Sequence, residues 1–137
     1  MSQPFIDSNI ALYLLSGDAI KADRAEALLE AGGVISVQVL NEVASVCQRK
    51  LKMPWEEIEM LLKVVKSACN IVPLTIASHE KAVEVANCLQ LSIYDANIVA
   101  SAILSGAGVL LSEDMQNGMN IEGLTIQNPF LPHQTSP

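Results

Sequence analysis

Phe5-Ile6-Asp7-Ser8-Asn9 is the stretch of sequence that decides the fold. Two apolar residues are followed by an aspartate and two small polar residues, and an apolar segment over residues 10–15 comes next. This pattern predicts a short buried strand that ends in a carboxylate and leads directly into a helix. Ligands of open α/β sheets bind beyond the carboxyl ends of the strands, so Asp7 is a candidate metal ligand. Asp7 is equally a candidate helix N-cap, because Asp, Ser and Asn all accept hydrogen bonds from free backbone N–H groups.

The composition predicts one globular domain. Of the 137 residues, 50% are hydrophobic and 17% are charged, which favours a packed core over disorder. No apolar run reaches the length of a membrane span, and no basic segment precedes the first apolar stretch as in a secretory signal. Cys47, Cys69 and Cys88 lack metal-type spacing, so we expect small buried hydrophobes in a reducing cytoplasm. We assign residues 1–130 to the domain and residues 131–137 to a C-terminal tail.

The charges are distributed unevenly along the chain. A formal net charge of −7 argues against a protein that coats nucleic acid through charge alone. No Lys or Arg follows Lys81, and most of the basic residues gather near the middle of the chain. These are Arg49, Lys50, Lys52, Lys63 and Lys66. They form either a solvated helix face or a local patch that contacts phosphates.

Short apolar strands alternate with one or two helices along the chain. Strands are expected at residues 5–6, 34–36, 109–111 and 124–128. Residues 71–74 form either an edge strand or a connector, because Pro73 cannot donate to a central ladder. Helices are expected after Asn9, over residues 19–31 and 37–50, and from Pro54, Ser78 and Asp95. This alternation predicts a three-layer α/β/α sandwich with a short, mostly parallel sheet.

Glu42 lies on the predicted helix over residues 37–50, outside its main apolar stripe. That stripe consists of Val37, Leu40, Ala44 and Cys47. Glu42 falls on a second row, with Val39 and Val46 one turn away on either side. A carboxylate between apolar neighbours is partly desolvated, which is unfavourable unless a partner compensates. The alternative is an edge position from which the side chain reaches water.

Two further aspartates occur at the borders of apolar elements. Asp95 opens a helix that is apolar nearly all round, and it is either a metal ligand or, with Ser92, half of a reciprocal capping box. The apolar strand at residues 109–111 continues into Ser112-Glu113-Asp114, so Asp114 also follows a strand end.

Right-handed crossovers would bring these acids to one edge of the sheet. Asp7, Glu42, Asp95 and Asp114 would then repel one another and raise each other's pKa values unless a counter-charge were present. Mg²⁺ prefers carboxylate oxygens and commonly bridges to phosphate. Such an ion polarises a phosphate and lowers the pKa of a bound water, so the expected chemistry is hydrolysis of a phosphodiester.

Four motifs give the chain a resemblance to the PIN-domain superfamily, and within it to the VapC-type toxins of bacterial toxin–antitoxin pairs. The motifs are Phe5-Ile6-Asp7-Ser8-Asn9, Val39-Leu40-Asn41-Glu42-Val43, the segment from Tyr94-Asp95-Ala96 to Ala102, and Leu111-Ser112-Glu113-Asp114. They stand in the family's order, and the resemblance covers nearly the whole chain, to about Pro129.

The resemblance implies a Mg²⁺- or Mn²⁺-dependent endoribonuclease that forms a homodimer and is inhibited by a small antitoxin protein. It makes Asp7, Glu42, Asp95 and Asp114 the metal-binding and catalytic acids, with Ser8, Asn9 and Ser112 orienting them or the attacking water. The basic residues Arg49, Lys50 and Lys52 would hold the RNA backbone.

One position departs from the family pattern. Many relatives have a further acid two or three residues beyond the last aspartate, where this chain has Gln116 and Asn117. Fewer charges there argue against a tightly held second metal ion, and Glu113 either substitutes or points to solvent. Two other functions are open: a non-catalytic PIN-like interaction module, and a phosphoacceptor receiver, against which the absence of any Lys after Lys81 counts.

Overall fold

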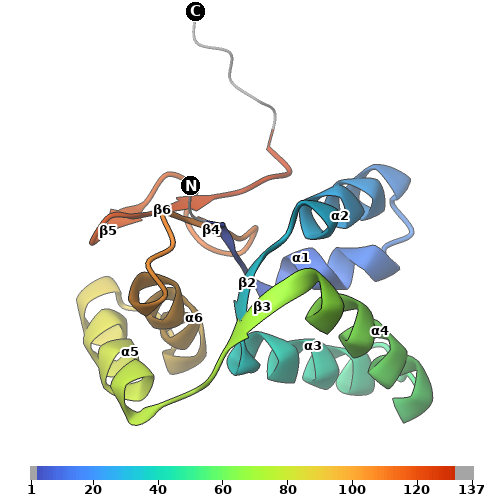
Figure 1. Ribbon diagram of the computed structural model, residues 1–137, viewed down its shortest axis with the longest axis horizontal. Coiled ribbons are helices and arrows are strands. Elements are labelled where there is room, and N and C mark those ends of the chain that lie inside the picture. Colours follow the sequence, from blue (N-terminus) through green and yellow to red (C-terminus); the bar gives the residue numbers. More distant parts are fainter. Residues whose placement is uncertain (1–2, 132–137) are drawn as a thin grey trace, which may run out of the picture.

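A single six-stranded sheet forms the centre of the computed structural model, which describes residues 3–131 (Figure 1). The strands stand in the order β3-β2-β1-β4-β6-β5, and every neighbouring pair is parallel except β5 and β6. Their bounds are β1 (Phe5–Ile6), β2 (Gly33–Ser36), β3 (Cys69–Val72), β4 (Val109–Leu111), β5 (Asn120–Ile121) and β6 (Leu124–Gln127). β1 therefore occupies a central place in the sheet, between β2 and β4.

Helices cover both faces of this sheet. The helices α1 to α4 lie on one side and α5 and α6 on the other (Figure 1). Their bounds are α1 (Ser8–Leu12), the short 3₁₀ helix η1 (Tyr13–Leu15), α2 (Ala19–Ala31), α3 (Val37–Arg49), α4 (Trp55–Ala68), α5 (Ile76–Leu89) and α6 (Ile93–Leu104). The predicted three-layer α/β/α architecture with a mostly parallel sheet is confirmed. None of the helices described is long and apolar enough to cross a membrane.

Local sequence sets the helix boundaries. Asp18 caps α2 by accepting hydrogen bonds from the backbone of Ile20 and Lys21, and Gly32 ends this helix with a φ of 87°. Ser36 caps α3 and Ser92 caps α6 in the same way. Asp7 is the single residue between β1 and α1, and β2 ends at Ser36, the cap of α3, so these two connections at the carboxyl edge of the sheet are short.

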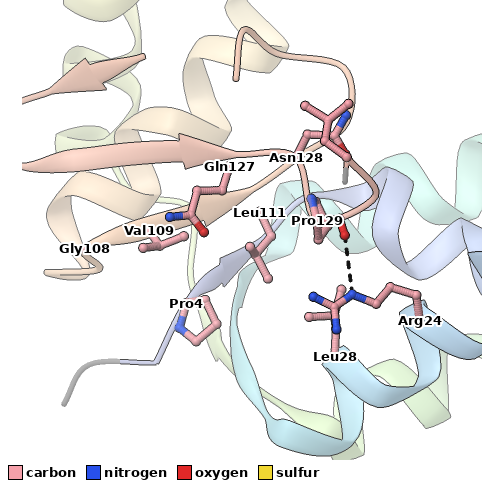
Figure 2. Close-up of a pocket in the computed structure, with 10 residues that line it drawn as sticks. Pro4, Arg24, Leu28, Gly108, Val109, Leu111, Gln127, Asn128 and Pro129 are labelled. Atoms are coloured by element: carbon pink, nitrogen blue, oxygen red, sulfur yellow. Dashed lines mark hydrogen bonds between the residues drawn. The ribbon is translucent and has the colours of Figure 1, made fainter. Parts of the chain in front are cut away.

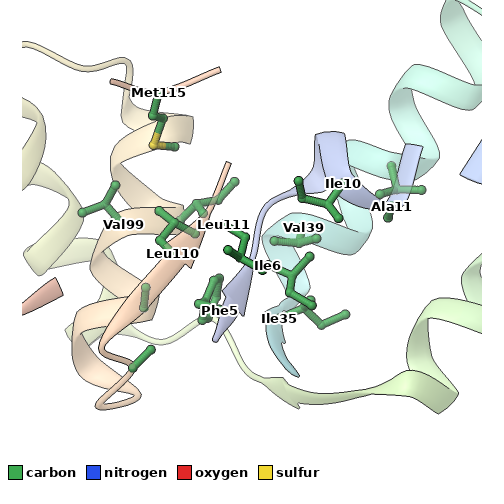
Figure 3. Packing of buried hydrophobic residues seen from close by; sticks show 14 of the residues in the cluster. Phe5, Ile6, Ile10, Ala11, Ile35, Val39, Val99, Leu110, Leu111 and Met115 are labelled. Atoms are coloured by element: carbon green, nitrogen blue, oxygen red, sulfur yellow. The ribbon is translucent and has the colours of Figure 1, made fainter. Parts of the chain in front are cut away.

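The core lies between the sheet and the two helical layers. Phe5 and Ile6 of β1 are fully buried, with Leu110 of β4 on one side and Ile35 of β2 on the other (Figure 3). The buried residues of α3 are Val39, Val43 and Cys47. The predicted stripe shares only Cys47 with this buried row; Leu40 and Ala44 are half-buried at the border of the core, and Val37 is also half-buried.

Several local predictions needed correction. Helix α5 begins earlier than predicted, because Thr75 is its cap and Ser78 completes a reciprocal capping box as the third helical residue. Residues 69–72 form an edge strand, one of the two alternatives, while the short antiparallel strand β5 was not predicted. Cys88 is exposed, so the prediction of three buried cysteines was wrong for it.

The last residues described lie against the helices of the α1–α4 layer. The ring of Phe130 meets that of Tyr13 edge-on at a centroid distance of 4.7 Å, and the carbonyl oxygen of Pro129 accepts a hydrogen bond from Arg24. Of the predicted tail over residues 131–137, all but Leu131 falls outside the described residues.

Candidate functional site

The register of the sheet places Asp7 and Ser112 side by side. Ile6 pairs with Leu111, and the backbone N–H of Asp7 donates to the Leu111 carbonyl oxygen at 3.0 Å. The two parallel strands thus end together, and the next residue of each chain segment turns its side chain into the same space. The Ser112 hydroxyl donates to Asp7 Oδ2 at 2.7 Å.

Asp7 is both the cap of α1 and the centre of a buried polar cluster. Its side chain is 3% exposed, and Oδ1 accepts a hydrogen bond from the backbone N–H of Ser8 at 2.7 Å. Oδ2 accepts from Ser112 and, at 3.3 Å, from the side-chain amide of Asn9. Both interpretations of Asp7 are therefore compatible, because one carboxylate oxygen serves the helix while the other faces the loop after β4.

Glu42 reaches the cluster from α3. The Ser8 hydroxyl lies 2.9 Å from Glu42 Oε1 and 3.3 Å from Asp7 Oδ1, so Ser8 bridges the two acids. Gln38, one turn earlier on α3, donates its side-chain amide to Glu42 Oε2 at 3.2 Å. These partners explain how a carboxylate is tolerated next to the buried Val39.

Asn9 connects the first strand to the loop that carries Asp114. Its side-chain nitrogen donates to Asp114 Oδ2 at 3.0 Å as well as to Asp7. Its side-chain oxygen accepts from the backbone N–H of Glu113 at 3.3 Å. One amide therefore fixes the exposed Asp114 relative to the buried Asp7.

Asp95 is half-buried in the first turn of α6. Its backbone N–H donates to the Ser92 hydroxyl at 3.1 Å, as in a capping box. The reciprocal bond is missing, since among residues 3–131 no hydrogen bond to the Asp95 carboxylate is present. Burial raises the pKa of Asp95, and the charge of Asp114 raises it further.

The electrostatics of Asp7 follow from burial without a counter-ion. Burial raises the pKa of Asp7 to about 6, although the hydrogen bonds from Ser112 and Ser8 lower it. The charges of Glu42 and Asp95 add to the rise. Within the described residues, every ion pair involves Lys21 or Lys81, and neither contacts one of these acids. The cluster is therefore an uncompensated patch of negative charge.

Glu113 does not join the cluster. Its carboxylate accepts a hydrogen bond from the Tyr13 hydroxyl and pairs with the Lys21 ammonium at 3.2 Å. Lys21 also lies over the Tyr13 ring, 4.6 Å from its centroid. Of the residues at the departure from the family pattern, Asn117 accepts a hydrogen bond from the Asn128 backbone, which is a structural role.

The donor set suits a hard divalent cation in its chemistry. Asp7, Asp95 and Asp114 offer carboxylate oxygens, and a cation would stabilise the ionised form of Asp7, whose pKa is raised by burial and, to a smaller extent, by the charges of Glu42 and Asp95. The side chains do not form a closed ligand sphere, however. Across residues 3–131, no three Asp, Glu, His or Cys side chains are grouped closely enough to hold one ion together.

An open groove adjoins the acids along α3. It encloses about 480 Å³ and is lined by Gln38, Asn41, Glu42, Ser45, Arg49 and Tyr94. Sequence reasoning had singled out Arg49 and Glu42 but missed Tyr94 and Gln38, although Gln38 stands at the i, i+4 spacing of a helical side-chain pair with Glu42. Lys50 and Lys52 are exposed just beyond the end of α3 and do not line the groove.

A second hollow lies away from these acids. It encloses about 800 Å³ between α2 and the strands β4 and β6, and Arg24 donates to Pro129 at its rim (Figure 2). None of the predicted acids lines it. The carboxylates, the groove and the strand ends define the candidate site instead.

Fold and site together define the class of protein. It is an α/β domain whose carboxylates gather beyond the ends of the central strands. The PIN-domain family model matches residues 5–116, and the chain belongs to this family. Its members are nucleases that generally use divalent metals. The comparison with curated proteins finds no match.

Solved structures share the fold at low sequence identity. A chain of a toxin–antitoxin complex from Klebsiella pneumoniae is 24% identical, with a TM-score of 0.69 over 93% of this chain and 98% of that one. VapBC2 from Rickettsia felis, solved with a DNA fragment of its promoter, is 21% identical, with a TM-score of 0.66 over 90% and 96%. VapC20 from Mycobacterium tuberculosis, a toxin that cleaves the sarcin-ricin loop, is 16% identical, with a TM-score of 0.62 over 80% and 90%.

Proposed function

We propose that this chain is a Mg²⁺- or Mn²⁺-dependent endoribonuclease and the toxin of a toxin–antitoxin pair. The observation that carries the proposal is the buried carboxylate of Asp7, which shares its surroundings with Glu42 and Asp95 and has a pKa raised to about 6. Folding such a cluster is unfavourable, and a cation that binds the charged form removes the repulsion. Membership in a family of nucleases supports phosphodiester hydrolysis as the reaction.

Each group of residues has a distinct task in this proposal. Asp7, Glu42, Asp95 and Asp114 would hold the metal, which supplies charge stabilisation at the phosphate and a more acidic water. Ser8, Asn9 and Ser112 orient the carboxylates through the hydrogen bonds described above. Arg49, Lys50 and Lys52 would bind phosphates of the RNA outside the acidic cluster, where their positive charges remain solvated.

A cleavage assay tests the catalytic assignment. The full chain is incubated with a set of structured RNAs and Mn²⁺ or Mg²⁺, beside the variants Asp7→Asn and Asp95→Asn. We expect each variant to lose at least about a hundredfold in rate, the upper end of the loss typical for a partner that only supports a metal ligand. Glu26→Gln, which removes an exposed carboxylate on α2, is the matched control and should cleave like the wild type. Equal rates in all four proteins would refute the assignment.

The cellular setting is a second part of the proposal. The chain resembles in fold proteins solved as toxin–antitoxin complexes, which supports a small antitoxin partner and a cytoplasmic location. Expression of the wild type should arrest bacterial growth while Asp7→Asn does not, and co-expression of a small protein encoded beside this gene should restore growth. We also propose a homodimer, which would bring two basic patches together on one RNA-binding assembly although each chain has a net charge of −7. Sedimentation equilibrium should give twice the monomer mass.

A non-catalytic PIN-like module is the alternative, and one observation favours it. No closed group of metal ligands is present in the part of the chain that the structure describes. Such a module would bind a partner through the same fold without needing a cation. Metal-dependent stabilisation separates the two functions, because only the nuclease should be stabilised by Mn²⁺.

A further inference from the structure

The groove along α3 has the composition of a nucleotide subsite. We propose that it binds one unpaired nucleotide of a single-stranded RNA segment, with the base stacked on Tyr94 and a phosphate held by Arg49. This inference rests on the proposed ribonuclease function and adds to it the residues that would hold the substrate beside the acids. The groove is open, encloses about 480 Å³, and has Glu42 in its lining, so it leads directly to the acidic cluster.

Tyr94 carries the stacking part of the proposal. Its side chain is 65% exposed although it directly precedes the half-buried Asp95 in the first turn of α6. Among the aromatic residues described, the only ring pair is that of Tyr13 and Phe130, so no other ring in this part of the chain covers Tyr94. A rigid ring held by a helix beside a catalytic carboxylate offers a base a stacking surface at little loss of conformational freedom.

Arg49 carries the phosphate part. It is the last residue of α3, is exposed, and forms none of the ion pairs found between residues 3 and 131. Glu42 stands two helical turns earlier and is already engaged by Ser8 and Gln38, which leaves the Arg49 guanidinium without a carboxylate partner. A guanidinium offers paired N–H donors that match a phosphate. It would hold that phosphate roughly 10 Å along the helix from Glu42.

The other residues that line the groove favour an unpaired base over a duplex. Gln38, Asn41 and Ser45 present amide and hydroxyl groups that can donate to and accept from the edge of a base. A base can lie flat on Tyr94 only when it is out of a helical stack. The groove thus selects single-stranded loops and ends, whereas a paired region would offer it phosphates alone.

Fluorescence anisotropy of the full chain in EDTA, which prevents metal-dependent cleavage, tests the proposal. The probes are a short labelled oligoadenylate, an abasic phosphodiester of the same length, and a duplex. Tyr94→Ala should weaken oligoadenylate binding about tenfold, the loss typical of one stacked base, while Tyr94→Phe should retain binding. Arg49→Gln should lower the slope of log affinity against log salt by about 0.7, the share of one phosphate on a single strand. Trp55→Ala and Lys66→Gln remove an exposed ring and an exposed cation from α4 outside the groove, and should leave affinity unchanged.

The outcomes separate this subsite from the proposed function. Unchanged affinity in Tyr94→Ala, equal binding of the abasic probe, tighter binding of the duplex, or no binding of oligoadenylate by the wild type would each overturn the subsite. A wild type that cleaves RNA with Mn²⁺ yet shows one of these results retains the ribonuclease function and loses the subsite. A wild type that binds as expected yet cleaves no RNA retains the subsite and loses the ribonuclease function.

Discussion

Asp7 shows how one residue can serve the fold and the site at once. Its Oδ1 caps α1 through the backbone of Ser8, while its Oδ2 accepts from Ser112 across the sheet. A neutral cap would satisfy the helix as well, since Ser and Asn cap with similar strength. The charge of Asp7 is therefore not needed for the helix, and it makes the metal-free fold less stable at neutral pH.

The raised pKa of Asp7 predicts a pH dependence of the metal-free fold. The folded-state pKa of about 6 lies above the unfolded value of 3.8, so the folded protein holds this proton more tightly. This tighter binding of the proton adds up to about 3 kcal/mol to the free energy of unfolding. The addition is fully present below about pH 4 and is lost as the pH rises to about 6. Urea unfolding in EDTA should show the free energy of unfolding of the wild type fall over this range relative to Asp7→Asn. Parallel curves for the two proteins would show that the Asp7 carboxyl is already ionised at pH 4.

Lys21 and Tyr13 hold the Glu113 carboxylate away from the acids. We predict that Lys21→Met frees Glu113 to turn toward Asp114 and lowers the cleavage rate about tenfold, in the range expected for partners that orient metal ligands. Lys21→Arg should restore the rate, because a guanidinium also pairs with Glu113. Lys81→Met, which removes a different surface ion pair with Glu84 and Glu122, is the control and should cleave normally. A normal rate in Lys21→Met would mean that Asn9 alone positions this loop.

At the scale of elements, the sequence predicted most of the boundaries wherever one residue decides them. Asp18 and Gly32 bracket α2 because a capping carboxylate and a left-handed glycine act locally. The start of α5 was misplaced because Thr75 and Ser78 are both capping residues, and only the backbone shows which of them lies outside the helix. The two-residue strand β5 carries too little pattern to be predicted, since its pairing with β6 comes from the intervening turn.

Gly33 at the start of β2 allows the central strands to approach closely. A Cβ atom there would lie 2.5 Å from the Ile6 side chain and 2.9 Å from the Pro4 carbonyl oxygen, which accepts a hydrogen bond from Val34. Gly33→Ala should therefore destabilise the protein by about 1 to 3 kcal/mol, the usual effect of overpacking. Gly17→Ala is the matched control, because nothing lies within 4 Å of its Cβ position. Urea midpoints measure both variants, and equal stability would show that β1 and Pro4 can shift without loss.

The whole molecule assembles the candidate site from distant parts of the chain. Strand ends alone led to Asp7 and Asp114, because parallel strands place their carboxyl ends at one edge. Helical spacing could not decide whether the Glu42 side chain points to water or to the other acids. The hydrogen bonds with Ser8 and Gln38 show that it turns toward Asp7. The removal of Glu113 from the cluster depends on Lys21, which is distant in sequence, so no local pattern could have predicted it.

Metal-dependent stability is the prediction that belongs to the whole chain. An ion that binds only the folded state at a hundredfold excess over its Kd adds about 2.7 kcal/mol, which raises the Tm by roughly 10 °C. Thermal melting of the wild type with Mn²⁺ should show this rise at pH 7.5, and Asp95→Asn should not, whereas Glu26→Gln should follow the wild type. The rise should shrink below about pH 6, because protons then compete with the cation for Asp7. A wild-type Tm that is the same in Mn²⁺ and in EDTA would favour the non-catalytic module, since a domain that binds no cation keeps its acidic cluster uncompensated under both conditions.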